Sequence, residues 1–115
     1  MSKSINRVQL LGNIGRDAEI KTTNSGIRVA TLSVATSESW KDKQSGEWKE
    51  RTEWHRVVVW SPALVKRIED QITKGTPVLI EGKLETRSYE AEGQKRYVTE
   101  IVVRPYAGDL IVLNR

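Results

Sequence analysis

The sequence predicts an all-β fold, a closed barrel of five strands with one helix between the third and fourth strands. Two observations favour this class. Short runs in which apolar and polar residues alternate are separated by turn signals, such as Asn24-Ser25-Gly26 and Glu92-Gly93. One segment, after the third run, instead carries apolar residues at helical spacing. The chain has 115 residues, so we expect a single domain over residues 1–115.

The first half of the chain supplies three strands. In the first, Val8 and Leu10 share one face, while Gly12 and Gly15 indicate a bend where a side chain would be crowded. Aliphatic residues dominate the second. The expected elements are a first strand over residues 5–15, a short continuation over 19–23, a second strand over 27–36, a loop over 42–46 and a third strand over 48–60.

The second half begins with the helix. Ser61 is a capping residue, Pro62 suits the first helical position, and Gly75 is placed to end the helix. Two more strands follow, and Pro105 stops the last of them. Three strands, a helix and two strands, in that order, are typical of an OB-fold. The remaining elements are a fourth strand over residues 77–89, a turn at 92–93, a fifth strand over 95–103 and a short apolar end over 110–113.

Composition narrows the class of protein. The absence of cysteine excludes disulfides and thiolate metal sites, and it fits a reducing compartment. No apolar run reaches the length of a signal peptide or the roughly 20 residues of a membrane span, so we expect a soluble, intracellular protein without membrane contact. The net charge of +4 fits an anionic partner such as nucleic acid, although many domains that bind nothing are as basic.

The residues that enzymes use are scarce. His55 is the one histidine, and no serine, aspartate or second histidine is tied to it by a recognisable spacing. The sequence has no glycine-rich phosphate loop, and its acidic residues are scattered among bases. We therefore expect no catalytic residue, no bound metal and no cofactor, and we interpret His55 as a packed or interface residue.

All four tryptophans lie between residues 37 and 60. On the expected third strand, Trp54, Arg56 and Trp60 share one face, and His55 shares the inward face with the valines. Rings interleaved with cations are typical of proteins that bind single-stranded nucleic acid, because bases stack on rings for about 1–3 kcal/mol each and cations follow the phosphates. The predicted binding residues are Trp40, Trp54, Trp60, Tyr89, Arg7, Lys43, Lys49, Arg56, Arg87 and Arg96.

Alternative interpretations stay open. Trp40 and Trp48 flank the loop and form a cross-strand brace in one of them, which we prefer for Trp48. Residues 37–60 hold five basic and five acidic residues, so the cations must be gathered by folding. Tyr97 and Tyr106 receive no role. A competing function is that of an OB-fold assembly module, such as a primosome subunit, whose tryptophan face binds protein.

Several segments, over residues 6–19, 35–40, 52–58, 74–87 and 96–103, resemble the bacterial single-stranded DNA-binding proteins. The resemblance implies an OB-fold that assembles as a homotetramer with DNA wound around it. It implies sequence-nonspecific coating of single strands in DNA replication, recombination and repair. The family's stacking rings map onto Trp40, Trp54, Trp60 and Tyr89, although the ring type varies at the last two positions. His55 maps onto a histidine of the subunit interface.

One departure from that family concerns the end of the chain. Family members usually continue into a flexible tail whose acidic tip recruits replication and repair enzymes, whereas this sequence stops at Leu113-Asn114-Arg115. The expectation is a truncated core or a tailless relative such as the mitochondrial form, without recruitment by this polypeptide. The implied location is the cytoplasm, at the nucleoid, or the mitochondrion.

Overall fold

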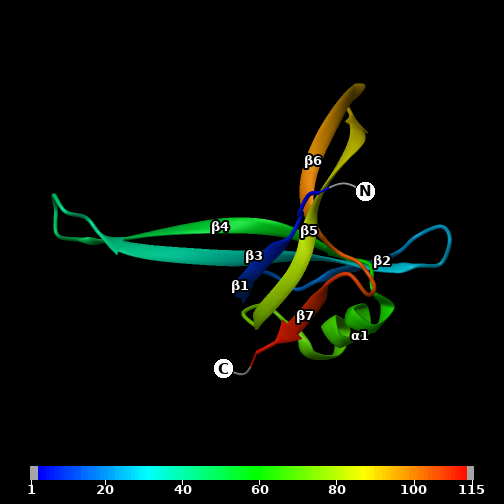
Figure 1. Ribbon diagram of the computed structural model, residues 1–115, viewed down its shortest axis with the longest axis horizontal. Coiled ribbons are helices and arrows are strands. Elements are labelled where there is room, and N and C mark those ends of the chain that lie inside the picture. Colours follow the sequence, from blue (N-terminus) through cyan, green and yellow to red (C-terminus); the bar gives the residue numbers. More distant parts are fainter. Residues whose placement is uncertain (1–2, 114–115) are drawn as a thin grey trace.

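The computed structural model describes residues 3–113 (Figure 1). Residues 1–2 and 114–115 of the expected domain, and with them the expected tailless end at Asn114 and Arg115, lie outside the described residues. Seven strands and one helix occur within 3–113. They are β1 (Val8–Ile14), β2 (Glu19–Thr22), β3 (Arg28–Lys41), β4 (Trp48–Val59), α1 (Pro62–Gln71), β5 (Pro77–Ala91), β6 (Gln94–Val103) and β7 (Asp109–Val112).

Five of these strands close into a barrel. The described strands follow the order β1-β3-β4-β6-β5, and β1 also pairs with β5, which completes the ring. β4 and β6 run parallel, and the other barrel pairs are antiparallel. The expected OB-fold, with its helix between the third and fourth barrel strands, is confirmed. The short strands β2 and β7 extend the sheet beside β3 and β5.

Gly12 stands where β1 passes from β5 to β3. β1 pairs with β5 from Val8 to Asn13, and with β3 at Asn13 and Ile14. A Cβ atom at Gly12 would lie 2.3 Å from the carbonyl oxygen of Ala35. The expected bend is therefore a close approach of two backbones, which a side chain would prevent.

The buried core consists of aliphatic side chains. In each barrel strand every second residue points inward, and α1 covers one end of the barrel. Because aliphatic side chains fill this space, the aromatic rings of the described residues remain outside it. The core residues are Leu10, Ile14, Ala30, Leu32, Val34, Val57, Val59, Leu64, Val65, Ile68, Ile72, Val78, Ile80, Ile101, Val103 and Leu110.

The helix begins as expected but ends earlier. The Ser61 hydroxyl accepts a hydrogen bond from the backbone N–H of Leu64, and Pro62 occupies the first turn. The expected stop at Gly75 is wrong, because the backbone is already extended at Ile72, whose side chain is buried in the core. Gly75 instead forms the next turn, at φ +91°, and donates to the Ile14 carbonyl over 2.7 Å. Across residues 3–113 no helix has the length and apolarity needed to cross a membrane.

Two long hairpins extend from the barrel in different directions (Figure 1). β3 was expected to end at residue 36, but it continues to Lys41 because residues 37–41 remain paired with β4. We call residues 35–54 the β3–β4 arm. The second arm ends in the expected turn, where Glu92 and Gly93 both have positive φ.

Candidate nucleic-acid interface

Trp54 lies on the outer face of the sheet with one side of its ring covered. Its strand position puts it on the same face as Arg56 and opposite to Val57. A Cβ atom at Gly15 would lie 2.2 Å from Cζ3 of the Trp54 ring, so the indole rests on the Gly15 backbone. The residue is 62% exposed, which leaves its other ring face open to solvent. This geometry suits a stacking platform, held from below and open above.

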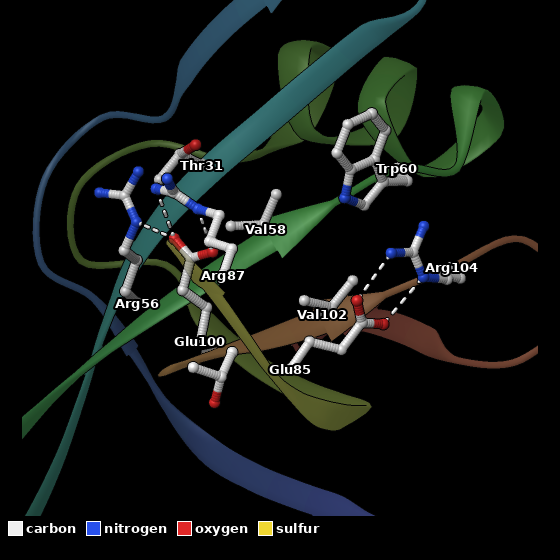
Figure 2. Close-up of a pocket in the computed structure, with 10 residues that line it drawn as sticks. Thr31, Arg56, Val58, Trp60, Glu85, Arg87, Glu100, Val102 and Arg104 are labelled. Atoms are coloured by element: carbon white, nitrogen blue, oxygen red, sulfur yellow. Dashed lines mark hydrogen bonds and ion pairs between the residues drawn. The ribbon is translucent and has the colours of Figure 1, made fainter. Parts of the chain in front are cut away.

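Arg56 and Arg87 converge on one buried carboxylate. The Glu100 side chain is 4% exposed and lies between the two guanidinium groups, as Figure 2 shows. Arg87 donates from Nε to Oε1 over 2.8 Å, and Arg56 donates from Nε to Oε2. The three residues come from β5, β4 and β6, and the parallel pairing of β4 with β6 sets Arg56 beside Glu100. Folding thus gathers cations that lie far apart in the sequence.

The two arginines also decide the ionisation of Glu100. Burial on its own raises the pKa of a carboxyl group, since the charged form loses its water. The hydrogen bonds and positive charges of Arg87 and Arg56 outweigh this effect, and the pKa of Glu100 lies below its usual range. Glu100 is therefore a carboxylate at neutral pH and neutralises part of the positive charge on this face.

Trp60 follows directly after β4, and its ring is partly covered. The Arg104 guanidinium carbon lies 5.7 Å from the ring centroid, within cation–π distance. Arg104 is held in turn by Glu85, through hydrogen bonds of 2.8 and 2.7 Å. Trp60, Arg104 and Glu85 line the same pocket as the Glu100 cluster (Figure 2). A fixed cation thus lies over the Trp60 ring.

Tyr89 extends this face along the second arm, the hairpin formed by β5 and β6, which we call the β5–β6 arm. Tyr89 and Arg87 are two residues apart on β5 and so share a face, and the Arg87 guanidinium carbon lies 5.9 Å from the tyrosine ring centroid. Arg96 pairs directly opposite Tyr89. Tyr97 lies on the other face of the same arm, with the Lys95 ammonium 5.7 Å from its ring.

The expected brace between Trp40 and Trp48 is wrong. Trp40 pairs directly with Lys49, and Trp48 pairs directly with Lys41. Adjacent positions of a strand face opposite sides, so the two rings lie on opposite faces of the arm. Trp48 shares the face of Trp54, whereas Trp40 shares the face of His55.

Other predicted residues lie apart from this centre. Lys43 is exposed in the loop, and Lys49 lies near the tip of the β3–β4 arm. Arg7 precedes β1, next to Asn6, whose side chain makes two hydrogen bonds with the backbone of Leu84. His55 is half-buried on the face of Val57, and a hydrogen bond of 2.8 Å joins its Nε2 to the Thr36 hydroxyl. Within residues 3–113, no group of three or more histidine or acidic side chains is placed to hold a metal ion.

Comparison with known proteins identifies the family. The profile of the single-strand binding protein family matches residues 5–107. The chain belongs to the single-strand binding protein family. It is 49% identical, over 115 residues, to the single-stranded DNA-binding proteins of Rickettsia felis and Rickettsia typhi, with 99% of this chain and 76% of each relative covered. The structure of the Plasmodium falciparum SSB complex with ssDNA matches with a TM-score of 0.86 and 39% identity, over 99% of each chain.

Sequence motifs had indicated this family, and that prediction is confirmed. The sequence did not predict that Arg104, Glu85 and Glu100 belong to this candidate nucleic-acid interface. Each has its partner in a distant segment of the chain, so no local pattern indicates it: Glu100 lies 44 residues from Arg56. The spacing of Glu85, Arg87 and Tyr89 on one strand face was the available signal.

Proposed function

We propose that this chain binds single-stranded DNA with little sequence preference and coats it during DNA replication, recombination and repair. The observation that carries the proposal is one continuous face on which Trp54, Trp60 and Tyr89 lie beside Arg56 and Arg87. Rings accept any base by stacking, and guanidinium groups accept phosphates. Membership of the single-strand binding protein family supports the same function.

The ion pairs of this face leave donors for phosphate. Arg56 contacts Glu100 through Nε, and its Nη groups have no hydrogen-bond partner among residues 3–113. The two arginine side chains are 47% and 51% exposed, so a phosphate reaches them from solvent. Glu100 holds both groups in place, which reduces the side-chain entropy lost on binding. We therefore assign binding, and no bond-making step, to this face.

The outer side of the barrel supports assembly with further copies of the chain. Leu11 pairs with Leu79, and Leu79 pairs with Ile111, so three aliphatic side chains form a row across β1, β5 and β7. Leu11 and Ile111 are exposed. The half-buried His55 lies on a separate surface. Closed tetramers commonly use more than one self-complementary contact, and these two surfaces fit the homotetramer that we propose.

The decisive experiment is a titration with oligo-dT at low and high salt, followed by tryptophan fluorescence. Single strands should quench the emission strongly and bind more weakly at high salt, because phosphate contacts release counterions. A duplex of equal length should bind poorly, since its bases are not free to stack. Unchanged emission and no binding of saturating oligo-dT would exclude this function and favour a face that binds protein.

His55→Lys is expected to yield smaller species at dilute protein concentration. A lysine loses the hydrogen bond to Thr36 and places a charge at a surface that assembly would bury. Light scattering over a dilution series measures the mass. His55→Gln, which keeps a hydrogen-bonding group, serves as the control. If the His55→Lys protein stays tetrameric at every dilution, His55 does not lie at a subunit contact.

A further inference from the structure

The tip of the β3–β4 arm carries the same pair of residue types on both faces. Trp40 lies directly opposite Lys49 on one face, and Trp48 lies directly opposite Lys41 on the other. Trp48 is 73% exposed, more than Trp40 or Trp54. The register therefore leaves Trp48 without the bracing partner that would explain a tryptophan at this position.

The side chains between Trp48 and Trp54 on this face of the arm are short and mostly polar. The two rings are six residues apart on one strand face, about 20 Å at 3.3 Å per residue. One base cannot contact both rings across that distance, but a continuous strand can. The side chains on the intervening face are small or hydroxylated except for Glu50, and a hydrogen bond of 2.9 Å joins Ser37 to Thr52. The face residues between the rings are Ser37, Ser39, Glu50 and Thr52.

Residues 41–50 at the tip hold three basic and three acidic side chains, so the placement of the lysines, rather than net charge, argues for an anionic occupant. Lys41 stands opposite Trp48, and Lys43 is exposed in the adjoining loop. The Asp42 carboxylate is turned to the loop itself, where it accepts hydrogen bonds from Gln44 N and Ser45 Oγ. A single exposed ring among hydroxyl groups and charged side chains of both signs is not the apolar patch that a protein partner needs.

We propose that Trp48 and Lys41 form a further stacking site for single-stranded DNA, so that the β3–β4 arm binds DNA on both of its faces. Trp48 stacks a base and Lys41 contacts a neighbouring phosphate. A strand that leaves Trp54 along the arm reaches this site, which lengthens the DNA segment that each subunit contacts. This inference rests on the proposed function, because it adds a site to the same DNA-binding surface.

The first test is affinity for oligo-dT of increasing length. Trp48→Ala should weaken binding of long oligonucleotides about five- to tenfold and leave short ones, which stay on the face of Trp54, Trp60 and Tyr89, within about twofold. Trp48→Phe should restore the affinity. Lys41→Ala should reduce the salt dependence of the affinity for long oligo-dT. Tyr106→Ala is the matched control, because its exposed ring lies beside Ser61 and Pro62 at the start of α1. Equal affinities of Trp48→Ala and wild type at every length overturn the proposal.

The second test observes Trp48 directly. A protein carrying Trp40→Phe, Trp54→Phe and Trp60→Phe keeps a ring at each position and emits from Trp48 alone. Quenching by saturating oligo-dT supports the site. Binding by anisotropy of labelled DNA without quenching overturns the site while the proposed function stands, whereas failure of wild-type protein to bind overturns the proposed function. A lower mass of Trp48→Ala in light scattering identifies a subunit contact and overturns the site.

Discussion

Trp54→Ala is expected to weaken binding of single-stranded DNA by about 1–3 kcal/mol, which corresponds to roughly a 5- to 150-fold higher Kd. The substitution removes the open ring face while the buried core stays intact, because Trp54 is largely exposed. Anisotropy of labelled oligo-dT gives the affinity, and circular dichroism reports the fold. Trp54→Phe, which keeps a ring, should recover most of the affinity. A loss of fold in Trp54→Ala would assign the ring to the core instead.

Gly15→Ala tests whether the position of the Trp54 ring matters, because it displaces the ring without removing it. The added methyl group would occupy the space of the Trp54 ring, so the ring has to move while remaining in the protein. We expect a loss of affinity smaller than that of Trp54→Ala, with a changed emission maximum in the absence of DNA. Wild-type affinity in this variant would show that stacking does not need the support of Gly15.

Glu100→Gln is expected to lower the free energy of unfolding at neutral pH by about 1.5–3 kcal/mol. The amide leaves Arg56 and Arg87 close together without the anion that neutralises them. Both guanidinium groups are about half exposed, so water screens part of their repulsion and the cost stays below that of a fully buried pair. Urea unfolding followed by circular dichroism measures the difference from wild type.

The pH dependence of the difference in unfolding free energy between wild type and Glu100→Gln isolates the contribution of the Glu100 charge. Its pKa in the folded protein lies below the ordinary value of 4.5. The stabilisation by the carboxylate is therefore fully present above the ordinary pKa, and it is lost as the pH falls through the lower, folded value. The gap between wild type and Glu100→Gln should be constant from neutral pH to about pH 5 and close in stronger acid. A gap that persists in acid would mean that the amide disturbs packing rather than charge.

DNA binding by Glu100→Gln should change in the opposite direction from stability. The arginines lose the carboxylate that holds them in place, but they also lose the negative charge that offsets theirs, and we expect the effect of charge to be the larger at low salt. Binding should therefore be tighter at low salt, and the slope of log K against log salt should steepen by about 0.7 for each added phosphate contact. An unchanged slope would place Arg56 and Arg87 away from the DNA.

The sequence predicted features that depend on strand or helix periodicity. Trp54 and Arg56 share a face because side chains alternate along a strand, and Ser61-Pro62 marks the helix start by local hydrogen bonding and a fixed φ. The helix end was missed because tertiary packing of Ile72, rather than the glycine, sets it. Local sequence signals do not predict a feature that depends on a residue far along the chain.

Register and long-range pairing account for the rest. The loop over residues 42–47 decides that Trp48 meets Lys41 rather than Trp40, and the sequence identifies a turn there without fixing which residues pair. The clustering of Arg56, Arg87 and Glu100 requires the parallel pairing of β4 with β6, a contact between distant segments. The family resemblance mapped its stacking rings onto Trp54, Trp60 and Tyr89, and strand alternation had already placed Trp54 and Trp60 on one face.

The aliphatic core has a practical consequence for spectroscopy. Since the described core contains no aromatic ring, the indole emission of this protein arises from its surface. Fluorescence should therefore respond strongly to a ligand that covers these rings, whereas far-ultraviolet circular dichroism should respond strongly to loss of the barrel. Measured on a single sample, the two signals together distinguish a variant that misfolds from one that folds and fails to bind DNA.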